Sequence, residues 1–249
     1  MFLKLKNIKI IKSFREKSNY YKNPAFLLKT LNKYGNEKGF WKTMTIMFLE
    51  IHDLLFDIIN RTNTFFPANL EDLDISSGNL EHGNRYTSTN VYTFIKILKK
   101  FVDYPEKKGY IDFGSGKGLT LLLAASHNFK KITGVEFSKE LCQTSIRNSS
   151  IYKNGLFSSK IKTLYRDASK YEINHIDSVF YFDNPFNDQI MKKVLANILT
   201  SIKINNRRIT IIYYSPQYQL DKLCNYLLRK DDCIILGKRY IIYENIEYN

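Results

Sequence analysis

YIDFGSGKG, residues 110–118, joins a short apolar run to three glycines at alternate positions, and a Leu- and Ala-rich stretch, residues 119–125, follows directly. A short apolar run before turn residues is typical of a buried strand, and the stretch after the glycines predicts a helix. Glycines in such a turn let the backbone approach a ligand at the helix start, because a Cβ would obstruct the approach and the positive φ angles. The sequence therefore predicts a nucleotide-type site at residues 112–118, the glycine loop.

Three nucleotide-binding patterns compete for the glycine loop. A P-loop requires G-x-x-x-x-G-K-[ST], but Gly118 stands where Ser or Thr would hold magnesium, and residue 111 is not glycine. We therefore reject a P-loop. A dinucleotide-binding loop requires G-x-G-x-x-G, and Leu119 occupies its last glycine position, which weakens that interpretation without eliminating it.

The third pattern fits the whole stretch. It resembles motif I of class I S-adenosylmethionine-dependent methyltransferases, which is apolar-apolar-D/E-x-G-x-G-x-G. The resemblance implies that Asp112 contacts the methionine amino end of the cofactor, directly or through water. It also implies that the loop folds around the cofactor through Gly114, Ser115, Gly116 and Gly118.

Two further segments follow in the order of that family's motifs. Glu136 ends the strand-like KITGVE, 18 residues after Gly118, near the spacing of an acid that accepts hydrogen bonds from both ribose hydroxyls. The resemblance implies that Phe137 stacks on the adenine and that Asp167 and Ala168 meet it, Asp167 accepting from the exocyclic amine. Each has a structural alternative: a solvated strand-end acid for Glu136, a core residue for Phe137, and a helix N-cap for Asp167.

From residue 91 onward the chain alternates strand-like and helix-like segments, which predicts an α/β fold with a mostly parallel sheet. The expected strands are Tyr110–Phe113, Lys131–Phe137, Ile161–Tyr165, Ser178–Phe182, Arg208–Tyr214, Cys233–Leu236 and Tyr240–Tyr243. The expected helices are Val91–Phe101, Leu119–Ala125, Lys139–Asn148, Gln189–Ile202 and Leu220–Arg229. The last two strands flank a tight turn at Gly237, so they must be antiparallel. This matches a Rossmann-like class I methyltransferase sheet of seven strands with the last one antiparallel.

The fourth expected strand leads into Asp183, Asn184, Pro185 and Phe186, which we call the DNPF turn. Ligands of such sheets bind beyond the carboxyl ends of the strands, so the turn should face the reactive sulfonium. It resembles a variant of the [DNS]-P-P-[YFW] motif of methyltransferases that act on amine or amide nitrogen. In those enzymes a polar side chain and a backbone carbonyl accept hydrogen bonds from the target nitrogen, and the aromatic ring packs on its plane. Asn184 occupies the first proline position, so either Asp183 or Asn184 is the polar contact; a plain Asn–Pro turn is the structural alternative.

The segment before the domain carries one more candidate residue. GNRYTST, residues 83–89, resembles the lead-in of a broad group of uncharacterised bacterial class I methyltransferases that also have Asn-Pro-Phe after the fourth strand. The resemblance implies that this segment closes over the methionine end of the cofactor and puts Tyr86 near the transferred methyl. The alternative is a loop whose Thr residues cap the following helix.

The N-terminal third differs in composition from the rest. We predict residues 1–85 as a helical extension or cap and residues 86–249 as the cofactor-binding domain. Residues 1 to about 35 are basic, and from Phe40 to about Asn60 apolar residues recur at helical spacing. A substrate-binding cap, a dimerisation element and a membrane-surface contact all fit this region.

The net charge and the cysteine content indicate which kinds of partner, metal site and disulfide the chain can have. The net charge of +14 allows an anionic partner such as nucleic acid, phospholipid or an acidic glycan. Three scattered cysteines without a CxxC, and four histidines without ligand spacing, predict no metal site and no disulfide framework. We find neither a signal peptide nor a membrane span in the sequence, so we expect a cytoplasmic protein.

The sequence therefore predicts an enzyme that transfers methyl from S-adenosylmethionine to a nitrogen acceptor, such as a protein amine or amide. Nucleic acid is an alternative acceptor that the positive charge permits. A glycan or small-molecule oxygen is another, although it needs a general base or a metal. A non-catalytic cofactor-binding scaffold is the alternative from a different class.

Overall fold

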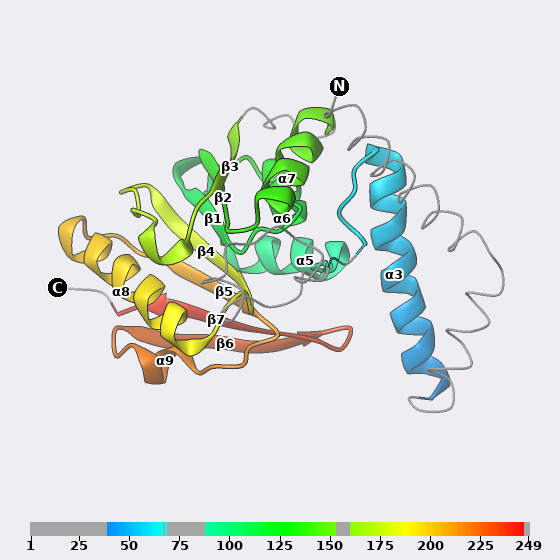
Figure 1. The fold of residues 1–249 in the computed structure, drawn as a ribbon. Coiled ribbons are helices and arrows are strands. Elements are labelled where there is room, and N and C mark those ends of the chain that lie inside the picture. The colour runs from blue at the N-terminus through cyan, green and yellow to red at the C-terminus, as the bar shows by residue number, and fades with distance from the viewer. Residues whose placement is uncertain (1–38, 67, 69–87, 153–159, 247–249) are drawn as a thin grey trace, which may run out of the picture. The chain divides into compact units, whose positions relative to one another are not determined.

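The computed structural model describes residues 39–66, 68, 88–152 and 160–246 (Figure 1). The chain divides into two compact units, residues 1–51 and 52–249. In the first unit the described residues form the start of helix α3 (Phe40–Asn60), whose bounds confirm the helix predicted there. The predicted domain boundary at residue 85 and the candidate Tyr86 lie outside the described residues.

The second unit contains a seven-stranded sheet with the strand order β3-β2-β1-β4-β5-β7-β6. The strands are β1 (Gly109–Phe113), β2 (Lys131–Glu136), β3 (Ile161–Tyr165), β4 (Asp177–Asp183), β5 (Thr210–Tyr214), β6 (Leu227–Ile235) and β7 (Lys238–Asn245). Strands β1 to β5 pair in parallel, and β7 is antiparallel to both of its neighbours, β5 and β6. The predicted seven-stranded sheet with an antiparallel last strand is confirmed.

Helices cover both faces of this sheet (Figure 1). They are α5 (Val91–Phe101), α6 (Leu119–Ala125), α7 (Lys139–Ile151), α8 (Asp188–Ile204) and α9 (Leu220–Leu223), with 3-10 turns η2 (Pro105–Lys107) and η4 (Ala168–Lys170). Alternate residues of each strand point to opposite faces, so Tyr110 joins the core under α5 and α6, whereas Ile111 joins the core under α8. The result is a three-layer α/β unit with two hydrophobic cores.

Polar caps and apolar stripes explain where these helices begin and which face they bury. The side chains of Asn90, Ser138 and Asn187 each accept a hydrogen bond from the backbone N–H three residues later, at the starts of α5, α7 and α8. Helix α8 buries a stripe at helical spacing, Met191, Val194, Leu195, Ile198 and Ile202. These local signals are readable from the sequence, and the predicted bounds of α5 and α6 are confirmed.

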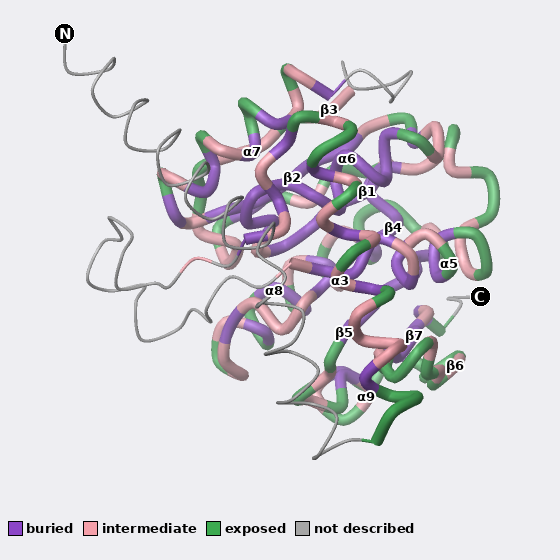
Figure 2. Tube along the Cα trace, turned by 90° about the vertical axis from the view of Figure 1, so that its right-hand side faces the viewer, coloured by how far each residue is buried: buried purple, intermediate pink, exposed green. Residues whose placement is uncertain are grey.

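The helix predicted over Leu220–Arg229 is wrong beyond its first turn. Helix α9 ends at Leu223, and β6 begins at Leu227, which is buried and pairs with Asn245 of β7. The strand then runs along the edge of the sheet with most of its residues exposed or half-buried (Figure 2). Pairing with β7 overrides the local helical pattern, because backbone hydrogen bonds to a neighbouring strand outweigh weak propensities.

Candidate functional site

The predicted site residues gather along one edge of the sheet. Strands β3, β2, β1 and β4 are neighbours in that order and run parallel, so their carboxyl ends meet at the same edge. Glu136 and Asp183 are the last residues of β2 and β4, the glycine loop begins at the end of β1, and Asp167 lies two residues after β3. In open α/β sheets this edge is where ligands bind.

The glycine loop packs against both of its neighbours. Gly114 and Gly118 have φ angles of +80° and +83°, a region that residues with a Cβ rarely adopt. A Cβ on Gly114 would overlap Pro185 of the DNPF turn, and one on Gly118 would overlap Ser145 of α7. The predicted cofactor loop and the predicted acceptor turn are therefore in direct contact.

We expect Gly114→Ala to lower the affinity for S-adenosylmethionine by about tenfold or more, because it adds backbone strain of about 1–3 kcal/mol and displaces Pro185. Calorimetric titration and thermal unfolding measure the two effects. Gly237→Ala is the matched control, since Gly237 has a φ of +78° and nothing within 4 Å of its Cβ position. Equal losses of affinity in both variants would mean that the contact with Pro185 plays no part.

Glu136 ties the glycine loop to β2. Its side chain is 2% exposed, and its two oxygens accept hydrogen bonds from the backbone N–H of Gly116 and of Ser138, each at 2.8 Å. Burial raises the pKa of Glu136 to about 7, although these backbone donors lower it. Each carboxylate oxygen has two lone pairs, so both can still accept a hydrogen bond from a ligand hydroxyl.

Asp112 is the second buried acid at this edge. Thr120 of α6 donates a hydrogen bond from its hydroxyl to Asp112 Oδ2. Burial, together with the nearby charges of Asp183 and Glu136, raises the pKa of Asp112 to about 8, although the hydrogen bond from Thr120 lowers it. Asp112 and Glu136 are buried and Asp183 is half-buried, and a bound cation would favour the ionised form of all three.

The side chains predicted to meet the adenine lie at the ends of β2 and β3. Asp167 Oδ1 accepts hydrogen bonds from the Ser169 N–H and hydroxyl, both at 2.8 Å, so this residue acts as the N-cap of η4. Phe137 and Ala168 are half-buried, and Ala168 packs against the core under α8. Contact of these residues with adenine stays a prediction.

In the DNPF turn the two polar candidates, Asp183 and Asn184, differ in their hydrogen-bond partners. Asp183 Oδ2 accepts a hydrogen bond from the Thr89 hydroxyl at 2.8 Å, and among the described residues its Oδ1 has no hydrogen-bond partner. Asn184 has a φ of +47°, and its Oδ1 accepts a hydrogen bond from the Tyr213 hydroxyl at 3.1 Å. Burial raises the pKa of Asp183 to about 7. Asp183 is therefore the better placed of the two to accept a hydrogen bond from a substrate.

The other two residues of the DNPF turn, Pro185 and Phe186, pack against the rest of the domain. Pro185 lies against Gly114, as described above. Phe186 is buried in the core under α8, where its ring meets Phe182 edge to face at a centroid distance of 6.1 Å. The predicted stacking of Phe186 on an acceptor group stays a prediction.

Sequence reasoning missed the residues that support Asp183. Thr89 lies within hydrogen-bond distance, 3.0 Å, of the Tyr181 hydroxyl as well as of Asp183. The next residue, Asn90, donates from its side chain to both carboxylate oxygens of Asp53 in α3, which also accepts from the Val91 N–H. No sequence motif identifies Asp53 as a supporting residue. The one available signal was a carboxylate within an otherwise apolar helical pattern.

Asp57, one helical turn later, supports the glycine loop in a similar way. Its carboxylate accepts from the Thr62 hydroxyl, from the N–H and hydroxyl of Thr64, and from the Phe65 N–H. This turn presents the Phe66 carbonyl, which accepts from Lys117 Nζ in the glycine loop at 2.7 Å. The segment after α3 therefore contacts the glycine loop at Lys117, whereas the DNPF turn contacts it at Gly114.

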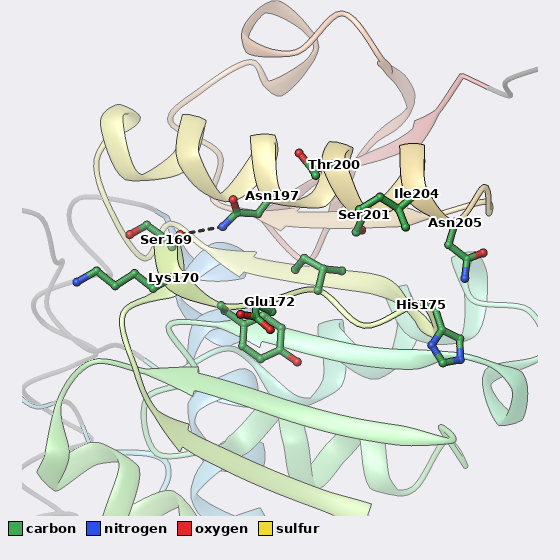
Figure 3. Close-up of a pocket in the computed structure, with 11 residues that line it drawn as sticks. Ser169, Lys170, Glu172, His175, Asn197, Thr200, Ser201, Ile204 and Asn205 are labelled. Atoms are coloured by element: carbon green, nitrogen blue, oxygen red, sulfur yellow. Dashed lines mark hydrogen bonds between the residues drawn. The ribbon is translucent and has the colours of Figure 1, made fainter.

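A cavity of about 500 Å³ lies elsewhere, between α8 and the segment that leads into β4 (Figure 3). Its lining includes Ser169, Tyr171, His175 and Asn205, and the Asn197 side-chain amide donates to the Ser169 carbonyl at 2.8 Å across it. None of the predicted site residues lines this cavity. In the part of the chain that the structure describes, no group of His, Cys, Asp and Glu is placed to hold a metal ion.

Several of the solved structures to which this chain is similar are methyltransferases. An RNA methyltransferase from Salinibacter ruber, in complex with S-adenosyl-L-homocysteine, matches with a TM-score of 0.50 and 14% identity over 66% of this chain and 96% of its own. The chain has the class I methyltransferase fold. Magnesium protoporphyrin IX methyltransferase from Synechocystis PCC 6803 with bound SAM gives 0.48 and 11% identity over 64% of this chain and 79% of its own. No protein-family model and no curated protein matches the chain.

Proposed function

We propose that this protein is an S-adenosylmethionine-dependent methyltransferase that methylates a nitrogen acceptor, such as a protein amine or amide. One observation carries the cofactor assignment. The buried carboxylate of Glu136, at the end of β2, is hydrogen-bonded to the glycine loop at Gly116 and keeps lone pairs for further donors. A carboxylate joined to a glycine-rich loop at the carboxyl edge of a parallel sheet suits a ligand with a ribose diol and positive charge.

In this proposal each buried acid holds one part of the cofactor. Glu136 accepts from the ribose hydroxyls, and Asp112 attracts the ammonium of the methionine end. Phe137 and the Asp167–Ala168 pair border the adenine. When bound, the cofactor supplies a methyl group on an electrophilic sulfonium, and the chain's task is to orient the acceptor toward it.

Asp183 performs that orientation in the proposal. Thr89 fixes Oδ2, so Oδ1 is the atom available to an acceptor N–H. A nitrogen whose hydrogens are held by Asp183 Oδ1 and by backbone carbonyls of the DNPF turn points its lone pair away from them. The pKa of about 7 also favours a second candidate, an oxygen acceptor with Asp183 as general base.

Calorimetric titration with S-adenosylmethionine and S-adenosylhomocysteine tests the cofactor assignment. Radiolabelled cofactor, incubated with host lysate separated into protein, nucleic acid, lipid and small-molecule fractions, then identifies the acceptor class. Label in protein that survives nuclease treatment supports the proposal. Absence of binding heat for both ligands, on protein shown to be folded, would refute the cofactor assignment.

Cofactor affinity is expected to fall as the pH drops from about 8.5 to about 6. The pKa values of Asp112 and Glu136 are raised by burial to about 8 and about 7, and the ligand binds their ionised forms. Binding is therefore strongest above these values and weakens as the acids take up protons. Calorimetry across this range in buffers of different ionisation enthalpy measures the linked protons. Affinity that does not change with pH would show that neither acid contacts the ligand.

A further inference from the structure

Strand β6 is an open edge of the sheet, with β7 as its one neighbour among the described strands (Figure 1). A two-residue turn joins the two strands, so the pair that flanks the turn, Ile235 and Lys238, is joined by backbone hydrogen bonds. Because such pairs alternate along an antiparallel ladder, the backbone groups of Ile234 and Asp232 point away from β7. The Asp232 N–H donates to the Asp231 side chain at 2.8 Å, as expected for a group on the open side. Outward-pointing backbone groups of this kind can pair with another strand.

The charges of β6 are arranged so that the strand is its own complement. Its middle reads Arg229, Lys230, Asp231 and Asp232, which are two cations followed by two anions. Charged side chains on an edge strand commonly keep copies of a protein apart. Here the sign changes halfway, so the charges attract in an antiparallel pair whose two-fold axis passes between residues 230 and 231. Arg229 then lies across from Asp232 of the second copy, and Lys230 lies across from Asp231 of the second copy.

A bulge in β6 puts the members of each such pair on the same face of the sheet. In a regular strand, residues three positions apart face opposite sides. The register with β7 shifts between Arg229 and Asp231, however, so Arg229 lies opposite Tyr243. Asp232 lies opposite Ile241, which belongs with Tyr243 to the core under α8. Arg229 and Asp232 therefore face the same side, where their side chains approach to 3.3 Å within one chain.

Exposed apolar residues flank the four charges on β6. Leu228 is 56% exposed and Ile234 is 68% exposed. In the part of the chain that the structure describes, no helix is long and apolar enough to cross a membrane. In the register set by the charges, Leu228 lies across from Cys233 of the second copy, and Ile234 lies across from Leu227. Pairing of two β6 strands would therefore remove both exposed apolar side chains from water.

We propose that two copies of this chain pair through antiparallel β6 strands into one continuous sheet, with seven strands from each copy. A second copy is the occupant because its β6 carries the matching order of charges, which a strand of another sequence would have to reproduce. Strand β3, at the other edge of the sheet, has Lys162 as its one charged residue and offers no such match. The net charge of +14 does not prevent pairing, because the Debye length of about 8 Å at physiological salt screens distant charges.

The charges of β6 also have partners within the chain. Lys100 pairs with Asp231 at 2.9 Å, and Arg239 pairs with Asp232 at 2.7 Å. These pairs lie at the surface, where an ion pair contributes little to stability, so a second copy can add to them or replace them. The two-fold axis points the carboxyl edges of the two sheets in opposite directions. Pairing therefore leaves both candidate sites open, and the proposal does not rest on the proposed function.

Two charge variants test the pairing by sedimentation equilibrium of the full-length protein from about 1 to about 100 µM. The acidic variant combines Arg229→Asp with Lys230→Asp, and the basic variant combines Asp231→Lys with Asp232→Lys. Each variant alone places like charges across the axis, so its self-association should be at least about tenfold weaker than that of the unsubstituted protein. An equimolar mixture makes every facing pair attractive, and it should form a heterodimer within about threefold of the original affinity.

The control for the acidic variant is Lys192→Asp combined with Lys193→Asp, which makes the same change of charge at exposed positions of α8. It should leave self-association unaltered. Circular dichroism and cofactor titration establish that each variant is folded, and retained cofactor binding in a monomeric variant separates this proposal from the proposed function.

A disulfide tests the register itself. The partners of Leu228 and Cys233 on β7 are residues 244 and 240, which face the same side. Leu228→Cys should therefore cross-link with Cys233 of the second copy under mild oxidation and give a covalent dimer, because residues directly across two strands meet the geometry of a disulfide. Leu228→Cys combined with Cys233→Ser should remain monomeric on a non-reducing gel.

Four results would overturn the proposal. The first two are a monomer at every concentration and self-association that neither charge variant weakens. The third is a mixture of the two charge variants that does not associate, since a merely structural role of these residues would not be rescued by mixing. The fourth is a covalent dimer of Leu228→Cys that persists unchanged with Cys233→Ser, which would exclude the proposed register.

Discussion

Asp183→Ala is expected to lower methyl transfer by about 100-fold or more while the affinity for S-adenosylmethionine changes by less than about threefold. The carboxylate lies at the end of β4, and Thr89 holds one of its oxygens. Removing it leaves the acceptor nitrogen without its hydrogen-bond partner. The cofactor contacts proposed for Glu136 and Asp112 are untouched.

The measurement pairs label transfer to the host fraction that accepts methyl with calorimetric titration of the cofactor. Asp188→Ala is the matched control, because Asp188 lies five residues later at the start of α8, and its exposed carboxylate pairs with Lys192. This control should retain full activity. If the affinity for the cofactor fell as much as the rate of methyl transfer, Asp183 would be assigned to cofactor binding and not to acceptor binding.

Asp183→Asn distinguishes the two acceptor chemistries. Asparagine keeps a carbonyl oxygen that can accept a hydrogen bond, so a nitrogen acceptor should retain activity within about tenfold of the unsubstituted protein. Asparagine cannot take up a proton, so an oxygen acceptor that needs a base should lose about as much activity as with alanine. Comparison of the two variants on the same acceptor fraction decides between the candidates.

The sequence predicted the parts of the fold that depend on local patterns. The helices α3, α5 and α6 match their predicted bounds. Apolar residues at helical spacing indicated α3, and a Leu- and Ala-rich run directly after the glycines indicated α6. The strands that end at the glycine loop and at Glu136 were found because short apolar runs lead into residues typical of a ligand site.

What the sequence did not predict depends on contacts between distant residues. The end of β6 was predicted as a strand, whereas its start, residues 227–229, was mistaken for the end of a helix because its pairing with β7 lies far from the Gly237 turn. Thr89 and Asp183 are 94 positions apart, and Asp53 reaches Asn90 across 37. Such hydrogen bonds form only after the strands and helices are in place, so no pattern within one segment can reveal them. The choice between Asp183 and Asn184 likewise required the partners of each side chain.

Glu136→Gln is expected to weaken S-adenosylmethionine binding by about 100-fold and to lower the free energy of unfolding by about 1–3 kcal/mol. The two carboxylate oxygens accept from Gly116 and Ser138. A glutamine side chain has one oxygen, so its amide N–H group must face one of these backbone donors, which loses its partner in a buried place. The same amide can no longer accept from one of the ribose hydroxyls.

Glu140→Gln, four residues later in α7, is the matched control and should change neither quantity by more than a small amount, since Glu140 is only half-buried. Calorimetry and urea unfolding supply the two measurements. A loss of stability alone, with affinity unchanged, would make Glu136 a structural residue of the glycine loop.

Contact with the ribose itself is tested with methylthioadenosine and its 2′-deoxy analogue. If Glu136 accepts from the 2′-hydroxyl, the unsubstituted protein should prefer the hydroxylated ligand, and Glu136→Gln should lose most of that preference. The coupling between the two changes isolates the hydrogen bond from the general weakening of the loop, because the loop is equally perturbed for both ligands. If Glu136→Gln kept the full preference for the 2′-hydroxylated ligand, the ribose would not contact Glu136. The proposed orientation of the cofactor along this edge would then be wrong.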